Sequence, residues 1–172
     1  GTGKSRAYRK ASDWIALKTG QKIGSGGWIK TRPGSQADIL LEQGSAVRLK
    51  ENSLLAVCKG RRSPDAIEAH LESGTVLCKI RRRRTDSQGK TTDDAFRVTT
   101  PTAVARVKGT SFAVNYRPDF RITQVQVMEG SVNFSGGKNA SLQMDLPAGR
   151  KIQFTPYHPE PLIGEIDTRG RE

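Results

Sequence analysis

The sequence predicts an all-β fold, and three observations support this prediction. After Gly20, short apolar runs are separated by clusters of Gly, Ser, Asn, Asp and Pro, a pattern typical of strands joined by turns. Within Thr99–Val114, apolar side chains occupy every other position, so that Ala103, Ala105 and Val107 share one face of a strand. No long segment shows the spacing of an amphipathic helix that would compete with the strands.

The elements follow in order along the chain. Tyr8–Lys18 places Ala11, Trp14, Ile15 and Lys18 at spacings of three and four, which favours a short N-terminal helix or a turn leading into the first strand. Each expected strand after it is an apolar run bounded by turn residues. These strands are Trp28–Thr31, Ala37–Leu41, Ala46–Lys50, Leu54–Cys58, Ala66–Leu71, Thr75–Arg82, Ala95–Thr99, Ala103–Val107, Ser111–Tyr116, Ile122–Met128, Val132–Phe134, Ser141–Leu146 and Lys151–Phe154.

A glycine followed by a hydroxyl residue precedes a predicted strand at four places. The pairs are Gly44-Ser45, Gly74-Thr75, Gly109-Thr110 and Gly130-Ser131. Glycine permits a positive φ or a close backbone approach at a corner, and the hydroxyl can bond a turn amide. Their irregular spacing argues against a strict solenoid and favours successive coils of one wrapped sheet.

The length of 172 residues is sufficient for one ordinary domain. We expect an N-terminal extension over residues 1–13, a β domain over 14–155 and a C-terminal tail over 156–172. No apolar run approaches the roughly 20 residues that span a bilayer. Membrane attachment is therefore expected only through an anchor outside this sequence.

The composition is strongly basic, with 29 Lys and Arg against 17 Asp and Glu and a formal net charge of +12. Such a charge favours an anionic partner, for example an anionic polysaccharide of the cell surface. Nucleic acid is disfavoured, because aromatic residues make up only 6% of the chain and none lies in its most basic run.

Basic residues concentrate in two predicted loops, Gly60–Asp65 and Arg81–Asp94, and at Lys79 on the strand that adjoins the second loop. These candidate residues for binding an anion or an acidic partner are Arg61, Arg62, Lys79, Arg81, Arg82, Arg83 and Arg84. Guanidinium groups can bond phosphate or carboxylate in a forked geometry. The alternative interpretation is a solvated hairpin loop whose charge discourages edge-to-edge pairing.

No catalytic, cofactor-binding or metal-binding set is predicted. His70 alternates with apolar residues, which predicts a side chain facing solvent between Glu68 and Glu72. Two cysteines, Cys58 and Cys78, are too few for a structural zinc site. They form either one disulfide between neighbouring strands or two packed free thiols, and the sequence leaves both alternatives open.

The string TTPTAVARVKGTSFAV, followed by VQVMEGSV, resembles the signature of the FecR domain. The matching signature residues are Pro101, Gly109, Thr110, Phe112 and Gly130, and the resemblance extends over Trp14–Phe154. It implies a wrapped β-sheet fold, similar to a β-helix or a sandwich. It also implies a non-catalytic domain in the periplasm or at the surface of a bacterium. The partner would be another envelope protein in signalling or scaffolding, with an anionic cell-wall polymer as the alternative that the charge suggests.

Overall fold

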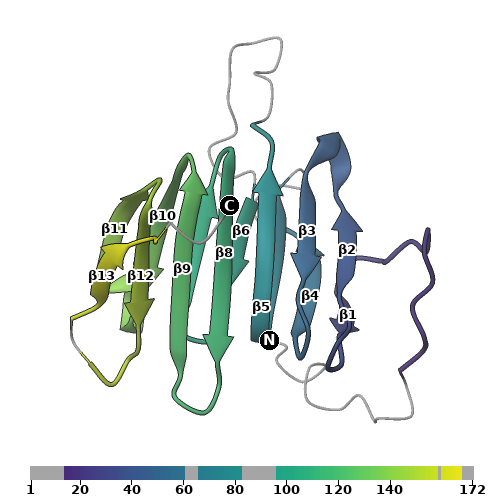
Figure 1. Cartoon of the computed structure of the whole chain (residues 1–172), viewed down its shortest axis with the longest axis horizontal. Coiled ribbons are helices and arrows are strands. Elements are labelled where there is room, and N and C mark those ends of the chain that lie inside the picture. Colours follow the sequence, from purple (N-terminus) through teal and green to yellow (C-terminus); the bar gives the residue numbers. More distant parts are fainter. Residues whose placement is uncertain (1–13, 61–65, 83–95, 159, 168–172) are drawn as a thin grey trace.

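The computed structural model describes residues 14–60, 66–82, 96–158 and 160–167. The described strands form one hydrogen-bonded sheet of 13 strands, which curls so that its two halves face each other (Figure 1). All their pairings are antiparallel except that of β5 with β6. The predicted all-β, wrapped-sheet fold is therefore confirmed.

Two layers make up the curled sheet. The first layer consists, in spatial order, of β1 (Gly27–Lys30), β4 (Leu54–Lys59), the first half of β5 (Ile67–Ile80), β6 (Phe96–Thr99), β7 (Ala103–Val107), β10 (Ser131–Gly136) and β11 (Leu142–Pro147). The second layer consists of β2 (Ala37–Leu40), β3 (Ala46–Leu49), the second half of β5, β8 (Thr110–Arg117), β9 (Ile122–Glu129), β12 (Arg150–Phe154) and β13 (Leu162–Glu165). Two 3-10 turns, η3 (Glu42–Gly44) and η4 (Lys138–Ala140), join strands.

Strand β5 belongs to both layers, because it turns a corner at Gly74. Gly74 has a φ of +93°, and a Cβ there would lie 2.6 Å from the Cα of Ser53. The Thr75 amide donates to Ser53 Oγ at 2.9 Å, which fixes the corner. The sequence predicted two separate strands here, Ala66–Leu71 and Thr75–Arg82. A glycine corner allows one continuous strand to serve both layers instead.

The corner brings the two ends of β5 to the same end of the molecule. Phe96 pairs with Ile67, at the start of β5, while Phe112 pairs with Cys78, near its end. The rings of Phe96 and Phe112 meet edge to face, with centroids 6.4 Å apart. The start and the end of β5 therefore lie at the same end of the fold.

The apolar core lies between the two layers. In both layers, every other side chain along a strand points into this core. Across the core, Phe134 of β10 meets Phe154 of β12 with ring centroids 5.9 Å apart. The largest fully buried side chains are Phe112, Phe134, Leu49, Leu55, Leu71, Leu146, Ile152, Val47, Val76, Val98, Val114 and Val125. Phe112 of the signature is thus a central core residue.

The segments near the two termini differ in structure. Of the segment Tyr8–Lys18, residues 14–18 contain no helix, and the remainder lies outside the described residues. At the other terminus, the sheet continues past residue 155, because β13 pairs antiparallel with β12. In the described part of the chain, no helix is long and apolar enough to span a bilayer.

Candidate functional site

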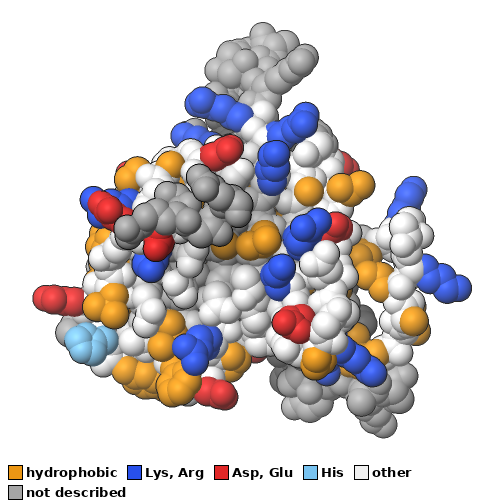
Figure 2. Space-filling model, in the orientation of Figure 1, with side chains coloured by type: hydrophobic (Ala, Val, Ile, Leu, Met, Phe, Trp, Pro, Cys, Tyr) orange, Lys and Arg blue, Asp and Glu red, His pale blue; other side chains and the backbone are white. Residues whose placement is uncertain are grey.

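Basic side chains surround the end of the molecule where β5 begins and ends. We call this region the basic end and define it by Lys59, Lys79, Arg81, Arg82 and Lys108, all of them exposed. Lys and Arg side chains gather around the end of β5 in the space-filling view (Figure 2). The described residues therefore place positive charge beside both the start and the end of β5.

A cleft of about 660 Å³ opens at the basic end. Its lining residues are Arg82, Arg106, Val107, Lys108, Gly109, Thr110, Gly130, Ser131, Asn133 and Asp145. Three of these side chains are cationic and one is a carboxylate, so the cleft favours an anionic ligand. The lining contains neither histidine nor cysteine. Its backbone, hydroxyl, amide and guanidinium groups are suited to binding by hydrogen bonds and charge.

The signature glycines shape the cleft through close backbone approach. A Cβ at Gly109 would lie 2.8 Å from the Cβ of Arg82. Gly130 has a φ of +79°, and a Cβ there would lie 2.7 Å from the carbonyl oxygen of Gly109. Thr110 Oγ1 donates to the Ser131 carbonyl at 2.8 Å, which ties the two turns together. Glycine at both positions thus allows three chain segments to meet beside Arg82.

Two polar contacts hold the cleft side chains on the outer face of the first layer. Arg106 Nη1 donates to Ser135 Oγ at 3.0 Å. Asn133 Nδ2 donates to Asp145 Oδ1 at 2.9 Å. Each contact joins neighbouring strands, so the arginine and the amide are held in place before a ligand arrives.

The cleft includes only part of the predicted binding set. Arg82 lines it, whereas Arg81 extends past Gly44 and donates its amide to Ser45 Oγ at 2.9 Å. Lys79 lies on β5 between Cys78 and Ile80, whose side chains are buried. Its own side chain therefore points to the outer face of the second layer, away from the cleft. Arg61, Arg62, Arg83 and Arg84 lie outside the described residues, and their role stays a prediction. Sequence reasoning missed Arg106, Lys108 and Asn133.

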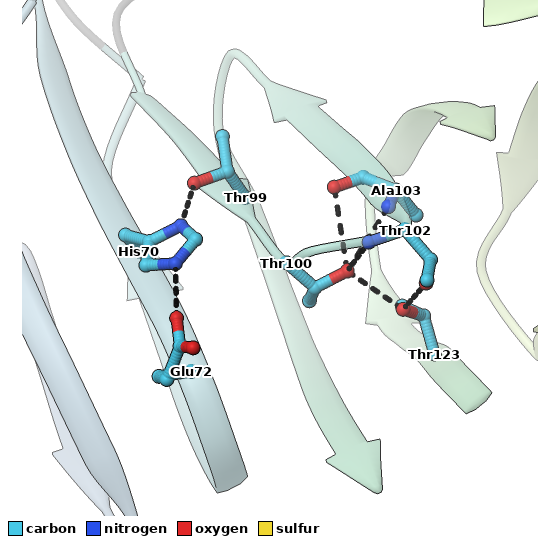
Figure 3. Close-up of polar contacts among 7 residues, drawn as sticks. All are labelled: His70, Glu72, Thr99, Thr100, Thr102, Ala103 and Thr123. Carbon is cyan, nitrogen blue, oxygen red and sulfur yellow. Dashed lines mark hydrogen bonds and ion pairs between the residues drawn. The ribbon is translucent and has the colours of Figure 1, made fainter. Parts of the chain in front are cut away.

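Thr100 and Thr102, the neighbours of the signature residue Pro101, form hydrogen bonds within the β6–β7 turn and with Thr123 (Figure 3). Thr100 Oγ1 accepts the amides of Thr102 and Ala103 at 3.2 and 3.0 Å. Thr123 on β9 bonds the hydroxyls of both Thr100 and Thr102 at 2.7 Å. These threonines connect the β6–β7 turn of the first layer with the second layer.

His70 lies on the outer face of the first layer, as alternation predicts, but its side chain is only 12% exposed. Its Nδ1 lies 2.8 Å from Thr99 Oγ1 and its Nε2 lies 2.7 Å from Glu72 Oε2 (Figure 3). The ring also meets Trp28 edge to face at 6.2 Å. The prediction of a solvent-facing histidine between Glu68 and Glu72 is therefore wrong, because Trp28 and Thr99 cover the ring.

The resulting order of hydroxyl, imidazole and carboxylate is that of a catalytic triad. None of Thr99, His70 and Glu72 lines the cleft. Thr99 is also the register partner of His70 in the β5–β6 pair, so the contact joins two adjacent strands. We interpret it as a structural link. Among the described residues, no group of three or more side chains is placed to hold a metal ion.

Both cysteines are free thiols, so the alternative of a disulfide is not realised. Cys78 points into the core, where burial raises the pKa of its thiol. On β4 the core side chains are Leu55 and Val57, so Cys58 points outward from the first layer. Side chains on opposite faces of a sheet do not meet the geometry of a disulfide.

Comparison with known proteins gives a family and a fold. A family model described as FecR protein matches residues 28–133, which include every cleft residue except Asp145. Two crystal structures of "a putative anti-sigma factor from Parabacteroides distasonis ATCC 8503", at 2.50 and 1.65 Å resolution, are also similar. Each has a TM-score of 0.67 and 22% identity over 83% of this chain. The match covers 61% of those chains, so the present chain corresponds to only part of their length. Among curated proteins, none matches by sequence.

Proposed function

Because this chain belongs to the FecR protein family, whose model covers residues 28–133, we propose that it is a non-catalytic interaction domain. It acts outside the cytoplasm and contacts a protein partner in signalling or scaffolding at the bacterial envelope. The contact is made at the cleft of the basic end. The likeness to the Parabacteroides structures supports the fold alone. The location, the partner and the contact surface are our proposal.

The observation that supports the proposal most directly is that signature residues build the cleft. Gly109, Thr110 and Gly130 all line it; Gly109 permits a close approach to Arg82, and Gly130 permits a close approach to the Gly109 carbonyl. These three signature residues line a cleft at the basic end and are not part of the apolar core between the layers. The cleft supplies donors and charge, which suits recognition of a partner.

Site-specific photocrosslinking in the parent bacterium tests this function. A benzophenone amino acid is introduced at Asn133 or Ser131, two exposed cleft positions, and at Leu40, which is 84% exposed on β2 and serves as the control. We expect the two cleft positions to give an adduct of the same mass with one envelope protein, and Leu40 to give none. Equal labelling from all three positions would contradict contact at the cleft.

A second candidate function is binding of an anionic surface polymer through the basic end. It is favoured by the concentration of Lys59, Lys79, Arg81, Arg82 and Lys108 around the cleft. The two functions differ in salt dependence. Binding of a polymer through exposed charges weakens steeply between low and physiological ionic strength, whereas a protein contact through half-buried charges is screened less.

A further inference from the structure

The outer face of the first layer carries a polar row across five strands. The register pairs Glu68 with Arg97, Arg97 with Arg106, Arg106 with Asn133, and Asn133 with Asp145. Each strand contributes one member, at the same level of the sheet. The row crosses the cleft, because its last three members are cleft residues.

Two arginines occupy the middle of this row. Phe96 and Val98 are buried on either side of Arg97, so its side chain points outward, and Arg106 lies outward between buried Ala105 and Val107 in the same way. Directly opposed residues on antiparallel strands have Cβ atoms about 4.5–5.5 Å apart. Like charges in this position destabilise a sheet. A neutral residue at either position would remove that cost.

Among the described residues, the two carboxylates of the row lie at its ends, and neither forms an ion pair with Arg97 or Arg106. The basic residues that form ion pairs within the described part of the chain are Arg48, His70 and Arg150. Neither Arg97 nor Arg106 forms one there. Both arginines are half-buried, which weakens screening by salt. The hydrogen bond from Arg106 to Ser135 uses one of its five N–H groups and leaves the others for a ligand. The geometry is that of a preformed site for anionic oxygen atoms.

The ends of the row select the kind of anion. Glu68 and Asp145 place carboxylates on both sides of the arginine pair. A polyanion with regularly repeated charges would meet repulsion at both ends, whereas one or two carboxylates at the centre would not. Asn133 and Ser131 add neutral hydrogen-bonding groups beside the centre. This pattern fits an acidic segment of a protein better than a phosphate polymer.

We propose that Arg97 and Arg106 form a carboxylate-binding site, which recognises an acidic segment of the partner protein. The proposal deepens the proposed function and rests on it, since Arg106 lines the same cleft and Arg97 is its register partner. Each guanidinium bonds carboxylate oxygens in a forked geometry, and Ser135 positions Arg106 for that contact.

The test measures binding of short blocked peptides to the full chain at low salt. The probes are acetyl-Gly-Glu-Gly-Glu-Gly-amide, its counterpart with Gln in place of Glu, and tripolyphosphate. Changes in backbone amide NMR shifts locate the site and give Kd. The variants are Arg97→Gln, Arg106→Gln and the double variant. Arg150→Gln is the matched control, because it removes the same charge from an arginine of the second layer that is paired with Glu165 at 3.9 Å.

We expect the Glu peptide to shift the amides around Arg106 and Asn133, and the Gln peptide to leave them unchanged. The double variant should raise Kd by about tenfold or more, and Arg150→Gln by less than about twofold. The double variant removes the like-charge pair but also the hydrogen bond from Arg106 to Ser135, so it should melt at about the temperature of the wild-type protein. A melting temperature lowered together with binding would instead identify the pair as structural and overturn the proposal.

Three further outcomes would overturn the carboxylate assignment. These are equal binding of the Gln peptide, unchanged binding by the double variant, and binding of tripolyphosphate at Arg97 and Arg106 more tightly than the Glu peptide. A different result would contradict the proposed function. If the peptide binds as expected but no protein crosslinks at Asn133, the function is wrong. If a protein crosslinks but the peptide does not bind, only the carboxylate assignment is wrong.

Discussion

The backbone of Arg82 lies against Gly109, leaving no room for a side chain at residue 109. A Cβ there would lie 2.8 Å from the Cβ of Arg82 and 3.0 Å from its Cα and its amide nitrogen. These contacts are with backbone atoms or atoms attached to them, so they cannot be relieved by rotating a flexible side chain. The glycine of the signature therefore fixes where the chain leaves β5 and where Arg82 enters the cleft.

Replacing Gly109 with Ala should lower both stability and anion binding. We expect a loss of about 1–3 kcal/mol in the free energy of unfolding, because the added methyl group must displace the Arg82 backbone. Urea denaturation measures this loss. Gly24→Ala is the control, since a Cβ at Gly24 meets no atom within 4 Å. Equal effects of the two substitutions would show that the close approach is unimportant.

The corner of β5 predicts a second glycine effect. Gly74→Ala combines a φ of +93° with a collision against Ser53, so we expect it to cost about 2–4 kcal/mol. Gly26→Ala has a similar φ of +84° in open space, and should cost only the conformational strain of about 1–2 kcal/mol. The difference between the two unfolding free energies measures the packing at the corner. No difference would contradict the role assigned to Ser53.

The threonine contacts near Pro101 predict a cost for removing one hydroxyl. Thr123 is 1% exposed, and its hydroxyl bonds both Thr100 and Thr102. Thr123→Val keeps the shape but leaves buried Thr100 without this partner, so we expect a loss of about 1–3 kcal/mol. Thr155→Val is the control, because that hydroxyl forms an exposed bond of 3.3 Å to the Phe120 carbonyl. A loss in the control as large as in Thr123→Val would argue against the assignment.

The two cysteines should differ in reactivity. Thiolate is the reactive form, and burial raises the pKa of the Cys78 thiol, which keeps it protonated and inaccessible. We expect a disulfide-exchange reagent to modify one thiol in the native protein and two in urea. Cys58→Ser should abolish the native reaction and leave one thiol in urea. Finding no free thiol in unreduced, denatured protein would mean that a disulfide forms after all.

The sequence alone predicted the elements that depend on local alternation of apolar and polar residues. The run Ala103–Val107 forms β7 with the predicted face buried, and Phe112 packs in the core. The corner at Gly74 was not predicted, because the same Ser-Gly pattern is compatible with a turn between two strands. Strand β13 was missed, since its neighbouring prolines suggested a tail.

The polar row and the cleft that it crosses could not be derived from the sequence, because both depend on pairing between distant strands. Alternation alone places Arg97 and Arg106 outward, but only the register of β6 with β7 makes them neighbours. The same is true of Asn133, which reaches the row through β10. Charge density pointed to the run of arginines after β5, and only Arg82 of that run is a described cleft residue.

The most direct test of contact at the cleft combines crosslinking with the arginine substitutions. The benzophenone residue at Asn133 is introduced into the wild-type background, into Arg97→Gln/Arg106→Gln and into Arg150→Gln, and the yield of the protein adduct is measured at physiological salt. Our account predicts that the yield falls by about tenfold in the double variant and is unchanged in Arg150→Gln. An undiminished adduct in the double variant would contradict recognition through the arginine pair.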